Sequence, residues 1–363
     1  MKGILTHFKK LDWILIIATL LLVAIGFLSI YSSSLSKGNF LNFQKQIIFL
    51  IVGFCLMMIL SFFDWRILRN DPYLIMVLYF SFLLVLAGLF FFAPEIRGVK
   101  SWYKIGPFLI DPIEPVKLIL IILLAKYFSM RHIEMYKISH IIFSGIYILI
   151  PAFLIFFQPN LGPILILISL WLGILIISGI KTRHLLILCL CGFLIFIFSW
   201  TFLLKDYHKD RIISFINPKI DPQGISWNIN QSKIAIGSGG IFGKGIGRGS
   251  QVQYGFLPFP QTDFIFAAIA EETGLFGIGT LMTLFAFLIW RIFKIAFSAE
   301  SNFPRLFAVG LAILFICQAF IHIGMNLGLL PIIGLSLPLV SYGGSGLIAS
   351  YIGLGILQSI KTH

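Results

Sequence analysis

Charged side chains are scarce in this sequence. There are 27 Lys and Arg and 14 Asp and Glu in 363 residues, so 11% of the chain is charged, against about 25% in an ordinary soluble domain. Apolar residues make up 59% of the chain. A soluble domain of this length covers itself with charge, and this chain has too little. The composition therefore excludes soluble globular, disordered and fibrous proteins and predicts an integral membrane protein.

Acidic side chains are the rarer charged kind, at 14 against 27 basic ones. In a membrane protein such a basic excess is typical of cytoplasmic loops and of contacts with anionic head groups, so it does not indicate a nucleic-acid partner. Because acids are so few, each one near a membrane segment is a candidate for function.

Cysteine is also sparse. The four cysteines, at positions 55, 189, 191 and 317, all lie inside apolar runs. Cys189 and Cys191 are two residues apart, so on a helix their side chains would point in nearly opposite directions. They are therefore not expected to bind one metal ion together or to form a disulfide with each other. We interpret all four as small buried hydrophobic side chains.

Long apolar segments recur along the chain. A membrane helix needs about 20 apolar residues, and the candidate segments are 13–32, 47–63, 74–92, 113–130, 141–157, 163–179, 185–204, 264–290, 304–326 and 347–360. We predict an all-α integral membrane protein with about ten transmembrane helices, forming a single polytopic membrane domain over residues 1–363. Residues 328–346 are rich in Gly and Pro yet apolar, and are expected to enter the protein without crossing.

Lys and Arg in short loops predict the orientation. With the N-terminus in the cytoplasm, 14 lie inside and 6 lie in the short outer loops. Adding the seven in residues 205–262 gives 14 against 13, but long segments cross regardless of charge. We therefore predict cytoplasmic termini, with residues 93–117 and a large extracytoplasmic loop, 205–262, between helices 7 and 8. The acids on the inside are interpreted as solvated: Asp12, Asp64, Asp71, Glu134 and Glu300.

The large loop contains a Gly-rich segment, Gly237–Gly249, that also holds Lys244 and Arg248. Glycine lets a backbone approach a ligand closely, and exposed N–H groups beside cations suit a phosphate. The spacing is not that of a Walker loop. A flexible hairpin linker is the alternative interpretation, and the pattern alone favours it.

Asp263 stands where an apolar helix is predicted to begin. Aspartate at a helix start is most often a capping or first-turn residue. The functional alternative is a carboxylate at the outer membrane surface that takes a proton from a hydroxyl nucleophile. Glu271 and Glu272, predicted to lie within the membrane, are about 12–13 Å further along the same helix. Proton-relay and structural hydrogen-bond roles are both open for them, and we favour the structural one.

Glu114 and Lys117 open the fourth predicted helix and share one face, three residues apart. They are either a surface ion pair of small energetic value or the lining of a cavity at the membrane mouth. The isolated polar residues Gln318, His322 and Asn326 are interpreted as hydrogen-bond donors and acceptors between helices.

Several strings together resemble the SEDS family (shape, elongation, division, sporulation). They are QSKIAIGSGG at 231–240, TDFIFA at 262–267 followed by Glu271 and Glu272, QPNLG at 158–162, GVKSW at 98–102 and PLVSYGGS at 338–345. The match covers nearly the whole chain. The form of the first string and the short C-terminal tail are most similar to the elongation member of the family.

The resemblance implies a ten-helix peptidoglycan glycosyltransferase of the bacterial inner membrane. It polymerises lipid II outside the membrane in complex with a class B penicillin-binding protein, among other elongation-machinery proteins. The family's essential aspartate maps onto Asp263, and its cavity Glu and Lys map onto Glu114 and Lys117. The resemblance thus favours the catalytic interpretation of Asp263 over the capping one.

Two departures from the family pattern bear on chemistry. Asn160 stands where the family usually has Asp, which leaves open a divalent cation (Mg²⁺ or Mn²⁺) as cofactor; its ligands are unknown. Residues 258–263 read PFPQTD, without the Glu and His that often precede the aspartate. A histidine partner for Asp263 is therefore not expected.

The chemistry that the resemblance implies needs a base for the acceptor hydroxyl and cations for the leaving diphosphate. Asp263 would be the base. The outer cations available for the diphosphate are Lys117, Lys233, Lys244, Arg248 and Arg211. The alternatives are a lipid II flippase, for which Glu271 and Glu272 would suit proton coupling, and a non-catalytic scaffold for the penicillin-binding protein.

Overall fold

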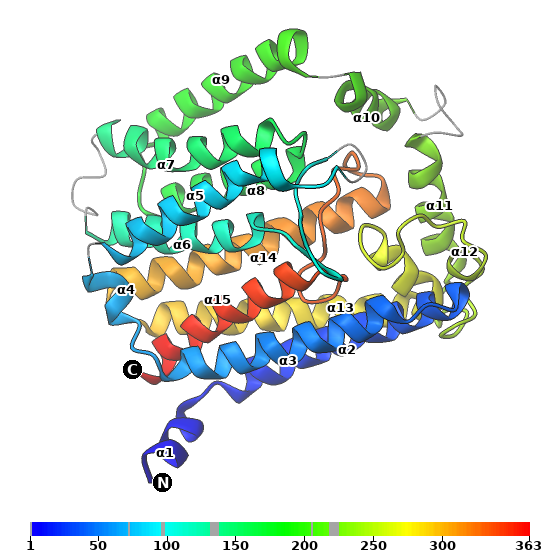
Figure 1. Ribbon diagram of the computed structural model, residues 1–363, viewed down its shortest axis with the longest axis horizontal. Coiled ribbons are helices and arrows are strands. Elements are labelled where there is room, and N and C mark those ends of the chain that lie inside the picture. Colours follow the sequence, from blue (N-terminus) through cyan, green and yellow to red (C-terminus); the bar gives the residue numbers. More distant parts are fainter. Residues whose placement is uncertain (1, 72, 96–98, 131–137, 205, 218–224) are drawn as a thin grey trace.

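The computed structural model describes residues 2–71, 73–95, 99–130, 138–204, 206–217 and 225–363. Within these ranges, ten long helices lie side by side and alternate in direction (Figure 1). They are α2 (Trp13–Lys37), α3 (Leu41–Phe62), α5 (Leu74–Phe92), α6 (Ile113–Ser129), α7 (Ile138–Phe156), α8 (Leu161–Ile177), α9 (Thr182–Phe198), α13 (Ile265–Ser298), α14 (Asn302–Leu327) and α15 (Gly344–Thr362). Each predicted membrane segment overlaps one of them.

Seven of these described helices, α2, α3, α5, α7, α9, α13 and α14, are long and apolar enough to cross a membrane. The helices α6 and α8 have 17 residues each, and α15 has 19. The chain is a multi-pass membrane protein with an all-α core, as the composition predicts.

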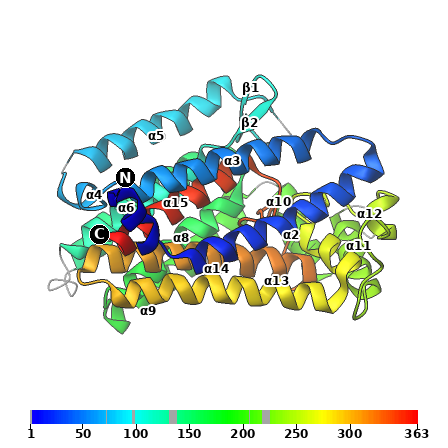
Figure 2. The same ribbon diagram turned by 90° about the horizontal axis from the view of Figure 1, so that it is seen from below.

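The core of the bundle is formed by α6 and α14, and the outside is apolar. Every residue from Val116 to Ala125 in α6 is buried, which is the pattern of a helix surrounded by other helices. Helix α9 lies at the edge of the bundle (Figures 1 and 2). It buries no residue and exposes large apolar side chains such as Phe193. Such a surface suits lipid. The burial predicted for the cysteines is wrong for Cys55, Cys189 and Cys191, which are exposed on this surface.

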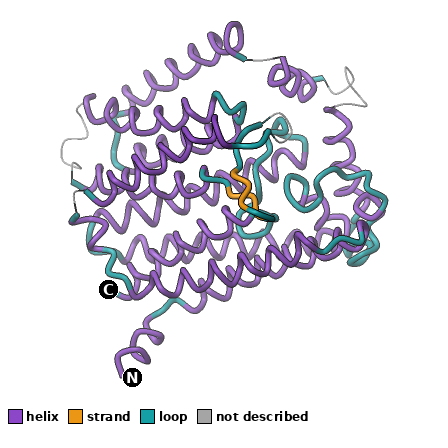
Figure 3. The backbone as a smooth tube through the Cα atoms, in the orientation of Figure 1, coloured by secondary structure: helices purple, strands orange, loops and turns teal. Residues whose placement is uncertain are grey.

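Both termini lie at one end of the bundle, and most of the irregular backbone lies at the other (Figures 1 and 3). The terminal end carries α1 (Lys2–Lys10) and α4 (Arg66–Asn70). The opposite end carries an antiparallel hairpin, β1 (Tyr103–Ile105) and β2 (Phe108–Ile110), and the non-helical residues 328–343. This last segment buries Leu335, Leu337 and Val340, so it enters the protein as expected.

The predicted outer loop is largely helical, which the sequence pattern did not indicate. After the π-helical turn η2 (Ser199–Leu203) come α10 (Asp206–Ile216), α11 (Ile225–Ser238) and α12 (Ser250–Gln253). Helix α11 packs against α13 and α14. The Gly-rich segment that follows lies on α13, so the alternative of a flexible linker is wrong.

The interpretation of the inner acids as solvated is wrong for Asp12. This residue is buried, accepts the N–H of Leu15 at 3.0 Å as the cap of α2, and forms an ion pair with Arg291 of α13. The Gln358 amide of α15 bonds both its backbone N–H and its carbonyl. Glu300 is exposed, and Asp64 and Asp71 are half-buried. Glu134 lies outside the described residues, as does Gly98 of the GVKSW string. Asp12 thus joins three helices.

Candidate active site

Asp263 is half-buried at the junction between the outer segment and α13. The N-cap position of α13 is occupied by Phe264, which makes no side-chain cap bond. Asp263 therefore precedes the cap position, and α13 does not begin with it as the capping interpretation required.

The backbone of Asp263 is held by α14. The Asn326 amide nitrogen donates to the Asp263 carbonyl at 2.9 Å and to the His322 carbonyl at 2.8 Å. The Asn326 amide oxygen accepts the N–H of Ala267 at 3.3 Å. His322 itself bonds the Leu335 carbonyl through Nδ1 at 2.7 Å. The predicted hydrogen bond between helices is confirmed for Asn326, which joins α14 to α13 through Ala267. His322 instead joins α14 to the non-helical residues 328–343.

The non-helical segment 328–343 also holds the backbone next to Asp263. The Ser341 hydroxyl donates to the Thr262 carbonyl at 3.0 Å, and the N–H of Tyr342 donates to the Gln261 carbonyl at 2.8 Å. The Gln261 side chain accepts from Asn42 of α3 at 2.7 Å. Asp263 is thus positioned by residues that are distant from it in the sequence.

Glu114 and Lys117 form the expected pair at the start of α6. Lys117 Nζ donates to Glu114 Oε1 at 2.7 Å; the lysine side chain is 0% exposed and the glutamate side chain 19% exposed. Glu114 also lines a small cavity with Gln318 of α14 and with residues 336–343. Ser341 lines this cavity and bonds the carbonyl next to Asp263. The ion pair and Asp263 therefore adjoin the same non-helical segment, from different elements.

Arg211 reaches this segment from the outer helix α10. Its Nη1 donates to the Ile332 carbonyl at 2.9 Å. Burial lowers the pKa of the Arg211 guanidinium, and the negative charge of Asp263 raises it. Arg211 and Asp263 therefore interact electrostatically, although 52 positions separate them in the sequence.

The other predicted cations are placed differently. Lys244 Nζ is 2.8 Å from Glu271 Oε1 in an ion pair. The side chain of Lys233 lies against Gly328, where α14 ends, and Arg248 is exposed. Arg211 is therefore the predicted diphosphate ligand that we associate with Asp263.

Asp111 is a half-buried acid that the sequence did not single out as functional. It precedes α6, its Oδ1 accepts the N–H of Ile113 at 2.9 Å, and its own N–H donates to Ser345. Burial and the charge of Glu114 raise the pKa of Asp111 to about 7, against the opposing effects of the Ile113 N–H and Lys117.

This raised pKa gives the fold a pH dependence. A carboxyl with a raised folded-state pKa binds its proton more tightly in the folded state, so its contribution to stability is lost as pH rises from about 4 through 7. We expect the thermal unfolding temperature in detergent to fall by a few degrees less between pH 5 and pH 8 in Asp111→Asn than in the wild type. Glu95→Gln, which removes an exposed acid, is the control. An unchanged pH dependence in Asp111→Asn would contradict the assignment.

The family model for cell cycle proteins of the FtsW, RodA and SpoVE type matches residues 12–363. The chain belongs to this family. It is 34% identical over 359 residues to stage V sporulation protein E of Bacillus subtilis, covering 97% of each sequence. It is also 34% identical over 350 residues to peptidoglycan glycosyltransferase MrdB of Escherichia coli K12, covering 95% of this chain and 93% of that protein.

Solved structures of the FtsW/RodA/SpoVE family have the same fold. A chain of a peptidoglycan synthase complex, described as coordinating polymerization and crosslinking, aligns with a TM-score of 0.81 at 30% identity over 97% of each chain. The rod shape determining protein RodA of Thermus thermophilus aligns with a TM-score of 0.71 at 28% identity, over 97% of this chain and 96% of that one. The resemblance drawn from the sequence strings is confirmed.

Asn160 is the residue at which the sequence left a divalent-cation site open, and its surroundings in the described part of the chain bear on that question. Asn160 occupies the N-cap of α8, and its amide nitrogen donates to the Ser101 hydroxyl at 3.3 Å. The amide oxygen of Asn160 carries no net charge, so this residue is a weaker ligand for a hard cation than the aspartate that the family usually has there. Within the described part of the chain, no three His, Cys, Asp or Glu side chains gather in one place. The residues do not fit a preformed metal site, and we derive no step through one.

Proposed function

We propose that this chain is the peptidoglycan glycosyltransferase of a cell-elongation system, polymerising lipid II at the outer face of the bacterial inner membrane. The observation that carries the proposal is the geometry of Asp263: a half-buried carboxylate whose backbone is held by α14 and by residues 328–343, with Arg211 close enough to affect it electrostatically. Family membership and the activity named for MrdB support it.

In the proposed reaction, Asp263 accepts the proton of the acceptor sugar's 4-hydroxyl as that oxygen attacks the anomeric carbon of the donor. The new C–O bond forms on the face opposite the diphosphate, the bond to the diphosphate breaks with its electron pair, and an α-linked donor becomes a β-linkage. Positioned general-base action is typically worth about 10²–10⁴-fold in rate. The proton remains on Asp263 until solvent removes it.

Arg211 is the cation we assign to the leaving diphosphate. A guanidinium presents a planar set of donors that suits phosphate oxygens, and its charge acts where charge develops. Its Nη1 donates to the Ile332 carbonyl, which holds the guanidinium at the non-helical segment 328–343.

We expect Arg211→Ala to lower kcat/KM for lipid II about 10²-fold, in line with the loss of one charge-stabilising donor. Arg211→Lys should keep part of the activity, because charge remains while the planar geometry is lost. The measurement is polymer formation from purified lipid II. Lys209→Ala, on the same helix, is the control, and equal loss in both alanine variants would contradict the assignment to Arg211.

The flippase alternative rested on Glu271 and Glu272 as proton carriers. In the structure both are hydrogen-bonded to the Gly-rich segment. Purified chain supplied with lipid II in detergent distinguishes the functions, because a flippase or a scaffold makes no polymer there. We expect glycan strands, with more of them in the presence of the partner.

The orientation and partner belong to the same proposal. We infer that the terminal end of the bundle faces the cytoplasm, since the short loops there hold most of the Lys and Arg. The partner is a class B penicillin-binding protein, which the similarity to a polymerising and crosslinking synthase complex supports. Lipid II and other elongation-machinery proteins are the remaining expected partners.

A further inference from the structure

Helix α13 is interrupted at Gly274, which divides it into two pieces. Gly274 has a φ of 63° and a ψ of −161°, outside the helical region. The piece after it, residues 275–298, is about 36 Å long, which by itself suffices for a hydrocarbon layer of about 30 Å. The piece before it, residues 265–273, is short and begins directly after Asp263. The interruption means that the long piece does not determine how the short piece is oriented.

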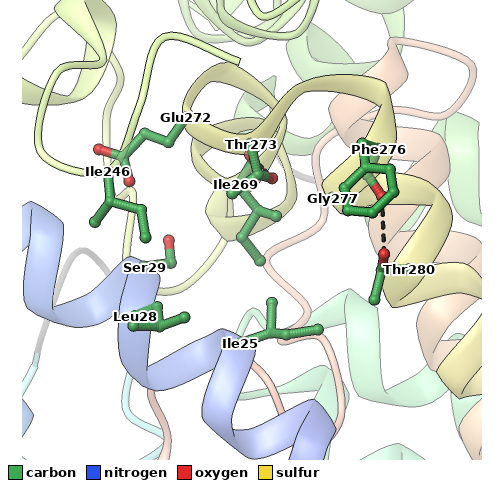
Figure 4. Close-up of a pocket in the computed structure, with 10 residues that line it drawn as sticks. All are labelled: Ile25, Leu28, Ser29, Ile246, Ile269, Glu272, Thr273, Phe276, Gly277 and Thr280. Carbon is green, nitrogen blue, oxygen red and sulfur yellow. Dashed lines mark hydrogen bonds between the residues drawn. The ribbon is translucent and has the colours of Figure 1, made fainter. Parts of the chain in front are cut away.

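Packing of the short piece against α2 is incomplete at this point. A pocket of about 230 Å³ lies between α2 and α13 beside the interruption (Figure 4). Its lining includes Leu28 and Ser29 of α2 and Glu272 and Thr273 of α13. Beside the pocket, the short piece meets α2 through the hydrogen bond from Ser32 to Glu272, and further contacts come from another segment.

The Gly-rich segment supplies the missing contact through its backbone. The N–H groups of Lys244 and Gly245 donate to the carbonyls of Glu271 and Glu272 at 3.0 and 2.9 Å. In return, the N–H groups of Leu275 and Phe276 donate to the carbonyls of Gly240 and Ile241 at 2.9 and 3.0 Å. These four bonds satisfy backbone groups that the interruption of the helix would otherwise leave unpaired.

The close approach explains why glycine is needed here. Gly243 has a φ of 78°, and a Cβ atom on it would lie 2.2 Å from the Glu272 carbonyl oxygen. A Cβ on Gly274 would lie 2.4 Å from the Gly243 nitrogen. Neither position has room for a side chain, so the glycines serve contact with α13.

The two carboxylates complete the attachment. Glu271 is fully buried and accepts from Lys244 Nζ at 2.8 Å, from the N–H of Gln251 at 2.9 Å and from the N–H of Val252 at 3.2 Å. Glu272 accepts from the N–H of Gly247 at 3.2 Å and from the Ser32 hydroxyl of α2. The segment's amides and its lysine thus bind anions, and those anions are the protein's own glutamates.

We propose that Glu271 and Glu272, with residues 239–252, form a clasp that positions Asp263 by fixing the short piece of α13. Asn326 holds the start of this piece and the clasp holds its end. The two glutamates are positioning residues, acting as hydrogen-bond acceptors. The inference rests on the proposed catalytic role of Asp263 for its effect on rate, and on the contacts alone for its effect on structure.

Glu271→Leu removes both side-chain oxygens that accept hydrogen bonds at position 271. Glu271→Gln keeps one acceptor oxygen but has no ionisable carboxyl. We expect kcat for lipid II polymerisation to fall about 10–100-fold in Glu271→Leu, since a displacement of about 1 Å can cost 10²-fold, with KM nearly unchanged. Glu271→Gln should retain most of the activity. Gly243→Ala, which alters no carboxyl, should resemble Glu271→Leu.

Hydrogen exchange gives a readout that does not depend on catalysis. The amides of Gln251 and Val252, which donate to Glu271, should exchange at least ~10-fold faster in Glu271→Leu than in the wild type, as bonds to a charged acceptor are lost. Exchange in Glu271→Gln should stay close to the wild type. Glu300→Gln, at the other end of α13, is the matched control for removal of an acid.

Two results would overturn the clasp. One is equal inactivity of Glu271→Gln and Glu271→Leu, which would identify a proton-carrying carboxyl; the other is unchanged exchange at the amides of Gln251 and Val252 in Glu271→Leu. If the catalytic role of Asp263 is wrong instead, Asp263→Asn stays active while the exchange result still holds. If Glu271→Leu does not fold, Glu271→Gln alone decides between acceptor and proton carrier.

Discussion

Asp263→Asn abolishes the formation of glycan polymer from purified lipid II: this is the largest effect that we expect. Asparagine has the shape of aspartate but cannot take a proton from the acceptor hydroxyl, so at least ~10²–10⁴-fold of rate should be lost. The bond from Asn326 uses the backbone carbonyl of residue 263, which asparagine keeps, so the variant should remain folded. Polymer length on gels, together with thermal unfolding, measures both properties.

The control for this variant is Asp210→Asn, which removes an exposed acid from the same outer segment. It should polymerise as the wild type does. Activity close to wild type in Asp263→Asn, with the protein supplied as the full chain and with its partner, would exclude Asp263 as the base.

The second large effect concerns the ion pair at the start of α6. Lys117 is fully buried and Glu114 is partly exposed, so removing the two partners should have unequal consequences. Glu114→Ala leaves a buried ammonium without its partner, which costs about 3–5 kcal/mol of unfolding free energy. Lys117→Met leaves a carboxylate that water can reach, and should destabilise the fold less. Chemical denaturation in detergent measures the difference.

A double variant separates stability from activity at this pair. Lys117→Met with Glu114→Gln removes both charges and should regain most of the stability that Glu114→Ala loses, because no buried charge is then unpaired. Polymerisation should stay low if the pair lines the substrate cavity, as we propose. A double variant that is both stable and fully active would show that the pair has only a structural role.

The membrane helices were predictable because hydropathy is a local property. Each apolar segment must span the same thickness of hydrocarbon, so the positions of α2 to α9 and α13 to α15 can be found from residue types alone. The helices α10 and α11 could not be found in this way, since they are short, amphipathic at best and stabilised by packing on the bundle.

The candidate site was predictable in part. Family strings identified Asp263, Glu114 and Lys117, and the spacing of three residues predicted the ion pair of the last two. The role of Asn326 and Ser341 in holding the backbone around Asp263 was not predictable, because these contacts join residues about 60–80 positions apart. The polar residue Asn326 near the C-terminal end of the apolar helix α14 was the signal, and it predicted a contact without its partner.

The scarce acids show where the sequence is sufficient. The scarcity of charge by itself determined that this is a membrane protein. Placing an unpaired charge in lipid is costly, so segments that lie in lipid contain few charged residues. The same scarcity limited the base to a few carboxylates. Which carboxylates form structural bonds was decided only by the tertiary structure, since Asp12, Glu271 and Glu272 are held by partners from distant segments.

The Gly-rich segment shows the same division. Its composition permitted a close approach of backbone or of an anion, because glycine has no side chain, but the pattern alone favoured a flexible linker. That the anions are Glu271 and Glu272, and that the backbone is the interruption of α13, depended on how the chain folds back on itself. Which segments form hydrogen bonds with each other depends on which segments the fold brings together, and the local sequence does not specify this.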